Sequence, residues 1–264
     1  MRIATWNINS VRLRIDIVLR LLDEVKPDVL CLQEIKCLND QFPAPALAAA
    51  GYPHIAVAGM KSYNGVAIVS RLPIEAHEVT HWCGREDCRH VAATLPGGIE
   101  IHNLYVPAGG DIPDPDVNEK FRHKLQFLDE MTAWWPAARP GDRKMVLVGD
   151  LNVAPLEHDV WSHKQLLNVV SHTPVEVEKL SALQTSIGWV DAIRRFVPED
   201  QKLYTWWSYR ARDWQLSNRG RRLDHVWVTP PLAGALTGHG VVREARGWEP
   251  KPSDHVPVWA DIAV

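Results

Sequence analysis

Short apolar runs recur along the chain, and several of them end in a polar residue or are interrupted by one. Six such runs are RIATWN, DVLCLQE, IEIHNLYVP, KMVLVGDLN, RRLDHVWVT and SDHVPVW. Because strands covered on both faces are apolar throughout, polar residues at their ends can converge at one edge of a sheet. The pattern predicts one functional site with eight candidate residues: Asn7, Glu34, Tyr105, Asp150, Asn152, Asp224, Asp254 and His255.

Helical periodicity alternates with these runs. Apolar residues recur at helical spacing between residues 11 and 25, with Ser10 as the expected N-cap and Pro27 as the stop. A second helix is predicted over residues 118–135, where Pro136 should end it. The chain therefore opens with the order strand, helix, strand.

The remaining apolar runs predict further strands. The runs VAATL and IEIHNLYV are separated only by PGG, which is typical of an antiparallel hairpin. Mixed helices and strands indicate an α/β (α+β) fold, a four-layer sandwich of two packed mixed β-sheets flanked by helices, in a single domain over residues 1–264. The other strands are expected at residues 29–33, 65–70, 91–95, 99–105, 145–149, 223–228 and 256–262.

Composition narrows the class of protein. With 264 residues and 46% hydrophobic content, the chain can bury a large core without disulfides or a structural metal. Its formal net charge of -3 gives no global attraction to nucleic acid, so such binding would need a local basic surface or metal ions. The N-terminus reads as a strand, and no apolar run approaches the roughly 20 residues of a membrane helix. We expect a cytoplasmic protein without a membrane partner.

The cysteines leave one alternative open. Cys83 and Cys88, in WCGREDCRH, could bind zinc together with His81 or His90. The irregular spacing and polar composition of this segment are more typical of a surface loop. The four cysteines of the chain are too few for a disulfide scaffold, so we expect reduced thiols.

The candidate residues suit metal-assisted phosphate chemistry. Hydrolysis of a phosphodiester needs an activated water, positive charge on the phosphoryl oxygens and help for the leaving alkoxide. Carboxylates such as Glu34 and amides such as Asn7 are hard oxygen ligands that suit Mg²⁺. Each motif alone has another explanation: GDLN can be a polar turn, and Glu34 a salt-bridge partner. Their recurrence at strand ends favours one metal-phosphate site.

Residues 203–224 combine tryptophans with arginines. Aromatic side chains beside a basic ridge can fill the space of a missing base while the arginines hold phosphates. The alternative is a core tryptophan pair with a solvated basic loop. The residues concerned are Trp206, Trp207, Trp214, Arg210, Arg212, Arg219, Arg221 and Arg222.

Taken together, these motifs resemble the endonuclease/exonuclease/phosphatase superfamily and, within it, the exonuclease III type of abasic-site DNA endonuclease. The resemblance covers essentially the whole chain, and WNINSVR, QEIK and YTWWSYR narrow it to that type. The markers occur in the order of the family: TWNINSVR, LCLQEIK, YNGVAIVSR, NLYVP, GDLNVAP, RRLDHVWV and KPSDHVPVW.

The resemblance implies a set of roles. Glu34 would be the principal ligand of Mg²⁺, with Mn²⁺ as the second candidate ion, and Asn7 and Asp254 would lie beside it. Asp150 would orient or activate the attacking water, assisted by Asn152.

The phosphate and the rest of the substrate would meet a second group of residues. His255 would contact the scissile phosphate with its ring held by Asp224, and Tyr105 would contact the phosphate or the leaving group. The family places an apolar pocket for the abasic sugar at Trp206 and Leu223. The complete set expected to bind substrate is Trp206, Leu223, Arg221, Arg222 and Tyr63.

The implied activity is that of a Mg²⁺-dependent DNA phosphodiesterase in base-excision repair. Such an enzyme, here expected to be a monomer, cleaves double-stranded DNA 5′ of abasic sites and trims or cleans 3′ ends. Three departures from the family pattern, Ala108, Asp111 and Asn9, bear on the balance of these activities. The alternatives are a superfamily hydrolase acting on a non-DNA phosphoester and a catalytically silent DNA-binding protein.

Overall fold

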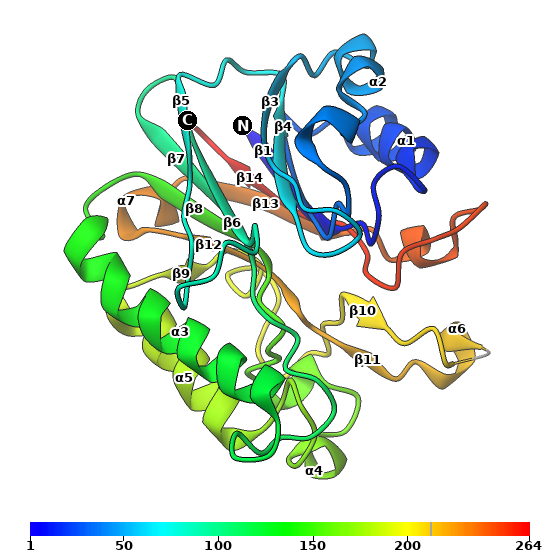
Figure 1. Cartoon of the computed structure of the whole chain (residues 1–264), viewed down its shortest axis with the longest axis vertical. Coiled ribbons are helices and arrows are strands. Elements are labelled where there is room, and N and C mark those ends of the chain that lie inside the picture. The colour runs from blue at the N-terminus through cyan, green and yellow to red at the C-terminus, as the bar shows by residue number, and fades with distance from the viewer. Residues whose placement is uncertain (212) are drawn as a thin grey trace.

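The computed structural model describes residues 1–211 and 213–264 and contains two six-stranded mixed sheets that pack face to face (Figure 1). The first sheet has the order β13 (Leu236–Val241), β14 (Val258–Ile262), β1 (Arg2–Asn7), β2 (Val29–Gln33), β4 (Val66–Ser70) and β3 (His54–Ala58). The second has the order β5 (Ala76–Val79), β6 (His90–Leu95), β7 (Ile99–Tyr105), β8 (Met145–Asp150), β12 (Asp224–Val228) and β9 (Val190–Asp191).

Helices cover the outer faces of both sheets, which completes the predicted four layers (Figure 1). Helices α1 (Ile15–Val25) and α2 (Ala44–Ala49) lie on the side of the first sheet, and α3 (Glu119–Ala138) and α5 (Pro174–Ser186) on that of the second. A short ribbon of β10 (Trp206–Trp207) and β11 (Gly220–Arg221) leads to α6 (Trp214–Ser217). The short elements are α4 (His163–Leu166), α7 (Pro230–Ala233) and the 3₁₀ turns η1 (Asn39–Gln41), η2 (Glu157–Asp159) and η3 (Arg243–Gly247).

The apolar runs of the central strands are nearly continuous because both faces of these strands are covered. On β1, Ile3 belongs to the core between the sheets, whereas Trp6 packs in the cluster that includes α1. On β8, Val146 lies between the sheets and Leu147 packs toward α3. Side chains alternate along a strand, so a strand between two layers is mainly apolar at successive positions, and its few buried polar residues need hydrogen-bond partners. Burying each such side chain contributes about 1.5–3 kcal/mol.

Strand direction brings the polar ends together. Strands β1 and β2 are parallel, as are β7 and β8, so each pair ends at one edge of its sheet. Strand β12 is antiparallel to β8, and its first residue, Asp224, pairs with the last residue of β8, Asp150. The hairpin of β6 and β7 is antiparallel, as predicted. One edge of the sandwich therefore collects the ends of β1, β2, β7 and β8 and the start of β12.

Two predicted helix ends are wrong. Helix α1 begins at Ile15, not after Ser10, because the Ser10 N–H donates to the Glu34 carbonyl at 2.7 Å and prolongs the pairing of β1 with β2. Helix α3 continues through Pro136 to Ala138. Pro136 is exposed in the last turn, where the carbonyl left without its usual donor can be hydrated.

The sequence also left several elements unrecognised, among them β3, β5, β13 and α5. Helix α5 begins with a capping box in which Thr173 and Glu176 bond reciprocally and Pro174 takes the first position. The predicted strands agree with the structure to within one or two residues at each end. None of the helices in the described ranges is long and apolar enough to cross a bilayer.

Candidate active site

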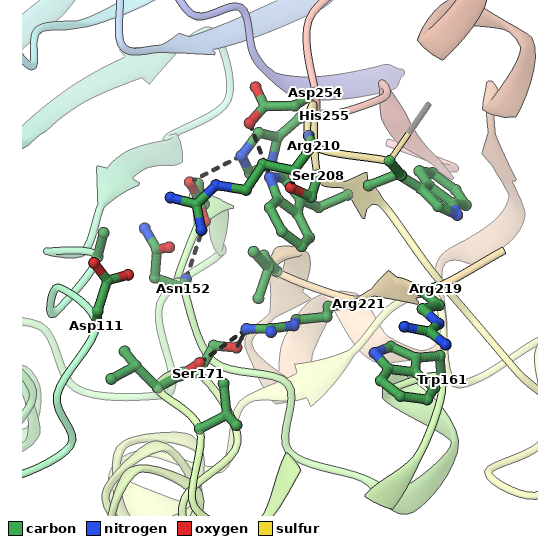
Figure 2. Close-up of a pocket in the computed structure, with 18 of the residues that line it drawn as sticks. Asp111, Asn152, Trp161, Ser171, Ser208, Arg210, Arg219, Arg221, Asp254 and His255 are labelled. Carbon is green, nitrogen blue, oxygen red and sulfur yellow. Dashed lines mark hydrogen bonds and ion pairs between the residues drawn. The ribbon is translucent and has the colours of Figure 1, made fainter. Parts of the chain in front are cut away.

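A cavity of about 710 Å³ opens at the edge where the polar strand ends meet (Figure 2). In the view of Figure 2, Asp254 and His255 lie above it, Asp111 and Asn152 to one side, and Ser171 and Arg221 below. Of the eight residues predicted from the strand ends, six line the cavity: Glu34, Tyr105, Asp150, Asn152, Asp254 and His255. The other two, Asn7 and Asp224, lie directly behind them.

Asn7 joins the two carboxylates at the centre. Its Nδ2 donates to Glu34 Oε1 and to Asp150 Oδ2, each at 2.9 Å. Its own Oδ1 accepts from the Asn9 N–H at 3.1 Å. Asn7 remains a predicted metal ligand. In this structure its amide nitrogen bridges Glu34 and Asp150 and its Oδ1 faces the backbone of Asn9.

Glu34 presents an ionised carboxylate to the cavity. Its Oε1 also accepts from the Tyr105 hydroxyl at 2.9 Å, and its Oε2 lies 2.7 Å from Lys36 Nζ. Burial by itself would raise the pKa of Glu34, but the Lys36 ammonium and these hydrogen bonds outweigh it, and the net pKa lies below the ordinary value. Lys36 was not singled out in the sequence, and its ammonium group favours the ionised form of Glu34.

Asn9 connects Asp254 with the ion pair of Lys36 and Glu34. The Asn9 Oδ1 accepts from Lys36 Nζ at 2.7 Å, and its Nδ2 donates to Asp254 Oδ1 at 3.3 Å. Two ionisable carboxylates with neighbouring amide groups form an oxygen-rich donor set of the kind that suits Mg²⁺. The residues present therefore fit a divalent ion held by Glu34 and Asp254.

Asp150, Asp224 and His255 form the most compact acidic group among the described residues, with potential ligand atoms within 4.8 Å of one another. His255 Nδ1 lies 2.8 Å from Asp224 Oδ2, and its Nε2 lies 3.6 Å from Asp150 Oδ2. Burial would lower the pKa of His255, but the two carboxylates outweigh it and raise the pKa. These three residues could hold a metal ion only with a neutral imidazole, and with His255 protonated the group is suited to holding and moving a proton.

Asp150 itself is held away from full ionisation. Burial raises its pKa, and the nearby Asp224 and Glu34 carboxylates act in the same direction, against His255 and the Asn7 amide. A carboxylate whose pKa approaches neutrality is suited to general-base work. The Asn152 N–H donates to the other oxygen, Asp150 Oδ1, at 3.0 Å and so orients the carboxylate.

The backbone at the site is strained at several positions. Asn9, Glu34 and Asn152 adopt positive φ angles of 48°, 50° and 54°. Such left-handed conformations in residues other than glycine cost of order 1 kcal/mol each and persist only where the surroundings impose them. At Gly149, which precedes Asp150, a Cβ would collide with the Leu104 carbonyl, so only glycine lets β8 approach β7 here.

A partly apolar pocket adjoins these polar groups. Its wall includes Trp206 and Leu223, and the Arg221 guanidinium lies 5.3 Å from the Trp206 ring. Trp206 Nε1 donates to Asp254 Oδ2 at 2.9 Å, and an antiparallel bridge pairs Trp206 with His255. The pocket wall is therefore attached directly to the polar centre. Trp161 and Val170 extend the apolar lining.

Two residues predicted to bind substrate do not line this cavity. Arg222 is 2% exposed and forms ion pairs with Asp159 and Asp191 in the interior. Because successive side chains in an extended segment point to opposite faces, Arg221 faces the cavity and Arg222 faces the core. Tyr63 is 55% exposed on the loop before β4 and does not line the cavity.

The other residues singled out in the sequence are placed as follows. Ala108 and Asp111, two departures from the family pattern, both line the cavity, as do Arg210 and Arg219. Arg212 lies outside the described residues. Cys83 donates its backbone N–H to Glu130 at 2.6 Å, and His90 Nε2 lies 3.1 Å from His102 Nδ1. Among the described residues, Cys83 and Cys88 form no group of three potential metal ligands with His81 or His90.

Comparisons with known proteins agree with this geometry. Residues 4–255 match the Endonuclease/Exonuclease/phosphatase family. The chain is 28% identical to exodeoxyribonuclease III of Haemophilus influenzae, with 99% of this chain and all of the relative covered. It is 32% identical to the DNA repair nuclease APEX1 of Danio rerio, covering the whole chain and 83% of the relative.

Solved structures show the same similarity in three dimensions. An AP endonuclease from Archaeoglobus fulgidus superposes with a TM-score of 0.92 at 35% identity, with both chains fully covered. A 3′ phosphatase from Neisseria, NExo, bound to a product DNA hairpin, superposes with a TM-score of 0.89 at 35% identity, with 99% of each chain covered. The arrangement of two sheets and four layers is thus shared over the full length.

Proposed function

The chain belongs to the endonuclease/exonuclease/phosphatase family, and from this we infer that it is a DNA repair nuclease that hydrolyses phosphodiesters with Mg²⁺. The observation that carries the proposal is the single cavity in which Glu34, Asp150 and His255 meet a partly apolar pocket. A site of this kind combines a metal-binding carboxylate, a base and a protonated imidazole. We propose cleavage 5′ of abasic sites, with 3′-end trimming as a second activity.

Asp150 acts on the attacking water in this mechanism. Its pKa, raised by burial and by Asp224, suits it to take a proton near neutral pH. Asn152 orients the carboxylate through its N–H, and Asn7 holds it against Glu34. Asp150 is thus already aligned when the water attacks the phosphorus, which lowers the entropic cost of bringing the base and the water together.

His255 and Tyr105 stabilise the charge that develops on the phosphate. Asp224 accepts the Nδ1–H of His255, so the Nε2–H is directed at the cavity. Burial, with Glu34 and Asp150 nearby, raises the pKa of Tyr105, so its phenol keeps its proton, which it donates to Glu34 and would have to turn toward the phosphate when substrate binds. Glu34 and Asp254 would hold the Mg²⁺ ion, which when bound polarises the phosphoryl oxygens and assists the leaving alkoxide.

The pocket determines which nucleotide is accepted. Trp206 and Leu223 provide apolar surface for a deoxyribose that lacks its base. A normal nucleotide would first have to move its base out of this pocket, which favours abasic sites. Arg210 and Arg219, at the rim, attract the flanking phosphates without reading sequence. Asp111 places a negative charge on the opposite rim, which weakens binding of the backbone there.

We further propose that the protein is a single domain over residues 1–264 that acts as a monomer in the cytoplasm. The core between the sheets supports the single domain, because it contains residues from near both ends of the given sequence, such as Ile3 and Ile262. The coverage of the relatives also favours the single domain.

One assay tests the proposed activity. The purified protein is incubated with a duplex that carries one stable abasic-site analogue, and with an undamaged duplex that has a recessed 3′ end, each with Mg²⁺ or EDTA. We expect Mg²⁺-dependent cutting immediately 5′ of the analogue and slower shortening of the recessed end. If neither duplex is cut, the proposal is wrong, and small phosphoesters or RNA become the substrates to test.

A second candidate activity is removal of a 3′ phosphate. The observation that favours it is the similarity over 99% of both chains to the 3′ phosphatase NExo from Neisseria. A duplex with a 3′-phosphate terminus, added to the same assay, measures this activity. Faster release of inorganic phosphate than cutting at the analogue would make 3′-end cleaning the main activity.

A further inference from the structure

A fully buried lysine lies behind the active site. Lys124 belongs to α3 and is 0% exposed, although its neighbours Phe121 and Leu128 form the apolar face of that helix. Its Nζ donates to the Asn152 carbonyl at 2.7 Å and forms an ion pair with Glu176 of α5. Lys124 is not among the residues that line the cavity, and it contacts the turn that carries Asp150 from within the protein.

Glu176 is also 0% exposed, and its carboxylate accepts several hydrogen bonds. Besides Lys124, its carboxylate accepts from the Ser171 N–H at 2.9 Å, the Thr173 N–H at 3.1 Å and the Thr173 hydroxyl at 2.7 Å. A buried carboxylate with this many donors is rigid, because each bond restricts the others. The loop that contains Ser171 is therefore fixed relative to Lys124.

This loop reaches the pocket. Ser171 Oγ accepts from Arg221 Nη1 at 2.8 Å, and Arg221 Nη1 also donates to the Val170 carbonyl at 2.9 Å (Figure 2). Both Ser171 and Arg221 line the cavity. A continuous series of polar contacts thus runs from Asn152 through Lys124, Glu176 and Ser171 to Arg221.

Stability alone does not account for the buried pair. Replacing a buried ion pair by well-packed apolar residues is often neutral or stabilising. Helices α3 and α5 are already joined by apolar contacts that include Leu128 and Leu180, and by an exposed ion pair of Asp129 with Lys179 at 2.6 Å. The feature that these other contacts do not supply is the hydrogen bond from Lys124 to the Asn152 carbonyl.

We propose that Lys124 and Glu176 are positioning residues that hold the Asp150–Asn152 turn and the Arg221 wall of the pocket in a fixed relation. The inference rests on the proposed nuclease function. Lys124 acts on the turn, so its loss misplaces Asp150 and slows the chemical step. Glu176 acts on both Lys124 and Ser171, so its loss also loosens the pocket. Neither side chain contacts the substrate.

The test compares three variants in steady-state cleavage of the abasic duplex. Lys124→Met should lower kcat about 10- to 100-fold with little change in KM, because displacing a reacting group by about 1 Å costs on this order. Glu176→Gln should lower kcat about 10-fold and also raise KM severalfold. The matched control, Lys179→Met, removes the exposed pair between the same helices and should leave both constants within about twofold.

Thermal unfolding followed by circular dichroism establishes that each variant is folded in the assay. If folded Lys124→Met has the kcat of Lys179→Met, the proposal is overturned. If Lys124→Met does not fold, Glu176→Gln decides alone, because it keeps the shape and one of the two acceptor oxygens of the original side chain. A folded Glu176→Gln with unchanged kcat and KM then overturns the proposal.

Hydrolysis of bis(p-nitrophenyl) phosphate separates this proposal from the proposed function. This small diester needs the hydrolytic centre but not the pocket. Lys124→Met should slow its hydrolysis as much as that of DNA, whereas the KM effect of Glu176→Gln should be confined to the duplex. If the wild type hydrolyses the diester but not the duplex, the DNA substrate is wrong, and slow diester hydrolysis by Lys124→Met still supports the positioning role.

Discussion

Asp150 and Asp224 are direct partners across the antiparallel strands β8 and β12, so their carboxylates stand side by side at the end of the sheet. Two like charges in a buried site cannot both be fully ionised without a cation nearby. His255 supplies that cation, with Nδ1 against Asp224 and Nε2 toward Asp150. The electrostatics of the site thus follow from strand register.

Asp150→Asn should nearly abolish turnover while DNA binding remains. The amide cannot take a proton from water, and loss of a general base lowers the rate about 100- to 10,000-fold. Single-turnover cleavage of the abasic duplex measures the rate, and fluorescence anisotropy measures binding. Asp16→Asn, at an exposed position of α1, is the control. Turnover by Asp150→Asn equal to that of this control would show that Asp150 is not the base.

The pH dependence of kcat/KM should be bell-shaped. The rate depends on ionised Asp150, whose pKa is about 7, and so rises as the pH passes that value. It also depends on protonated His255, whose pKa is about 10, and so falls as the pH passes that value. Asp224 raises both pKa values, so Asp224→Asn should move both limbs to lower pH. A basic limb that stays in place in this variant would remove His255 from the mechanism.

Glu34→Gln should weaken metal binding. The neutral amide loses the charge that attracts a divalent ion, so the Mg²⁺ concentration for half-maximal activity should rise at least about tenfold. Isothermal titration calorimetry of Mg²⁺ in the absence of DNA gives a readout independent of catalysis. Glu24→Gln, on the exposed face of α1, is the matched control. Equal Mg²⁺ affinity in the two variants would exclude Glu34 as a ligand.

Arg222→Met should destabilise the protein without acting on DNA binding. The change leaves Asp159 and Asp191 without this buried cation, which lowers the free energy of unfolding by about 3–5 kcal/mol. Urea denaturation measures this difference. Arg195→Met, at an exposed position, should change the free energy by less than about 0.5 kcal/mol. A large loss of DNA affinity with unchanged stability would restore Arg222 to the substrate site.

Local pattern was sufficient for much of the fold. The strand at residues 145–149 (MVLVG) has no polar side chain and the strand at 99–105 is buried at every position, and such a strand with two covered faces needs little distant information to be recognised. Strands β5 and β13 were missed because their residues are exposed or half-buried and lack that signal. Helix α1 starts late because a pairing with Glu34, distant in sequence, overrides the local preference for a cap at Ser10.

The sequence by itself determined which chemical groups stand at the ends of the strands, because a polar residue after an apolar run is a local property of the chain. Tertiary structure alone decided how those groups face one another. It turned Arg221 to the cavity and Arg222 to the core, placed the Asn7 amide between Glu34 and Asp150, and joined Lys124 to Glu176 across two helices. These relations depend on strand register and helix packing between distant segments, and such long-range contacts leave no periodic signal in the residues that make them.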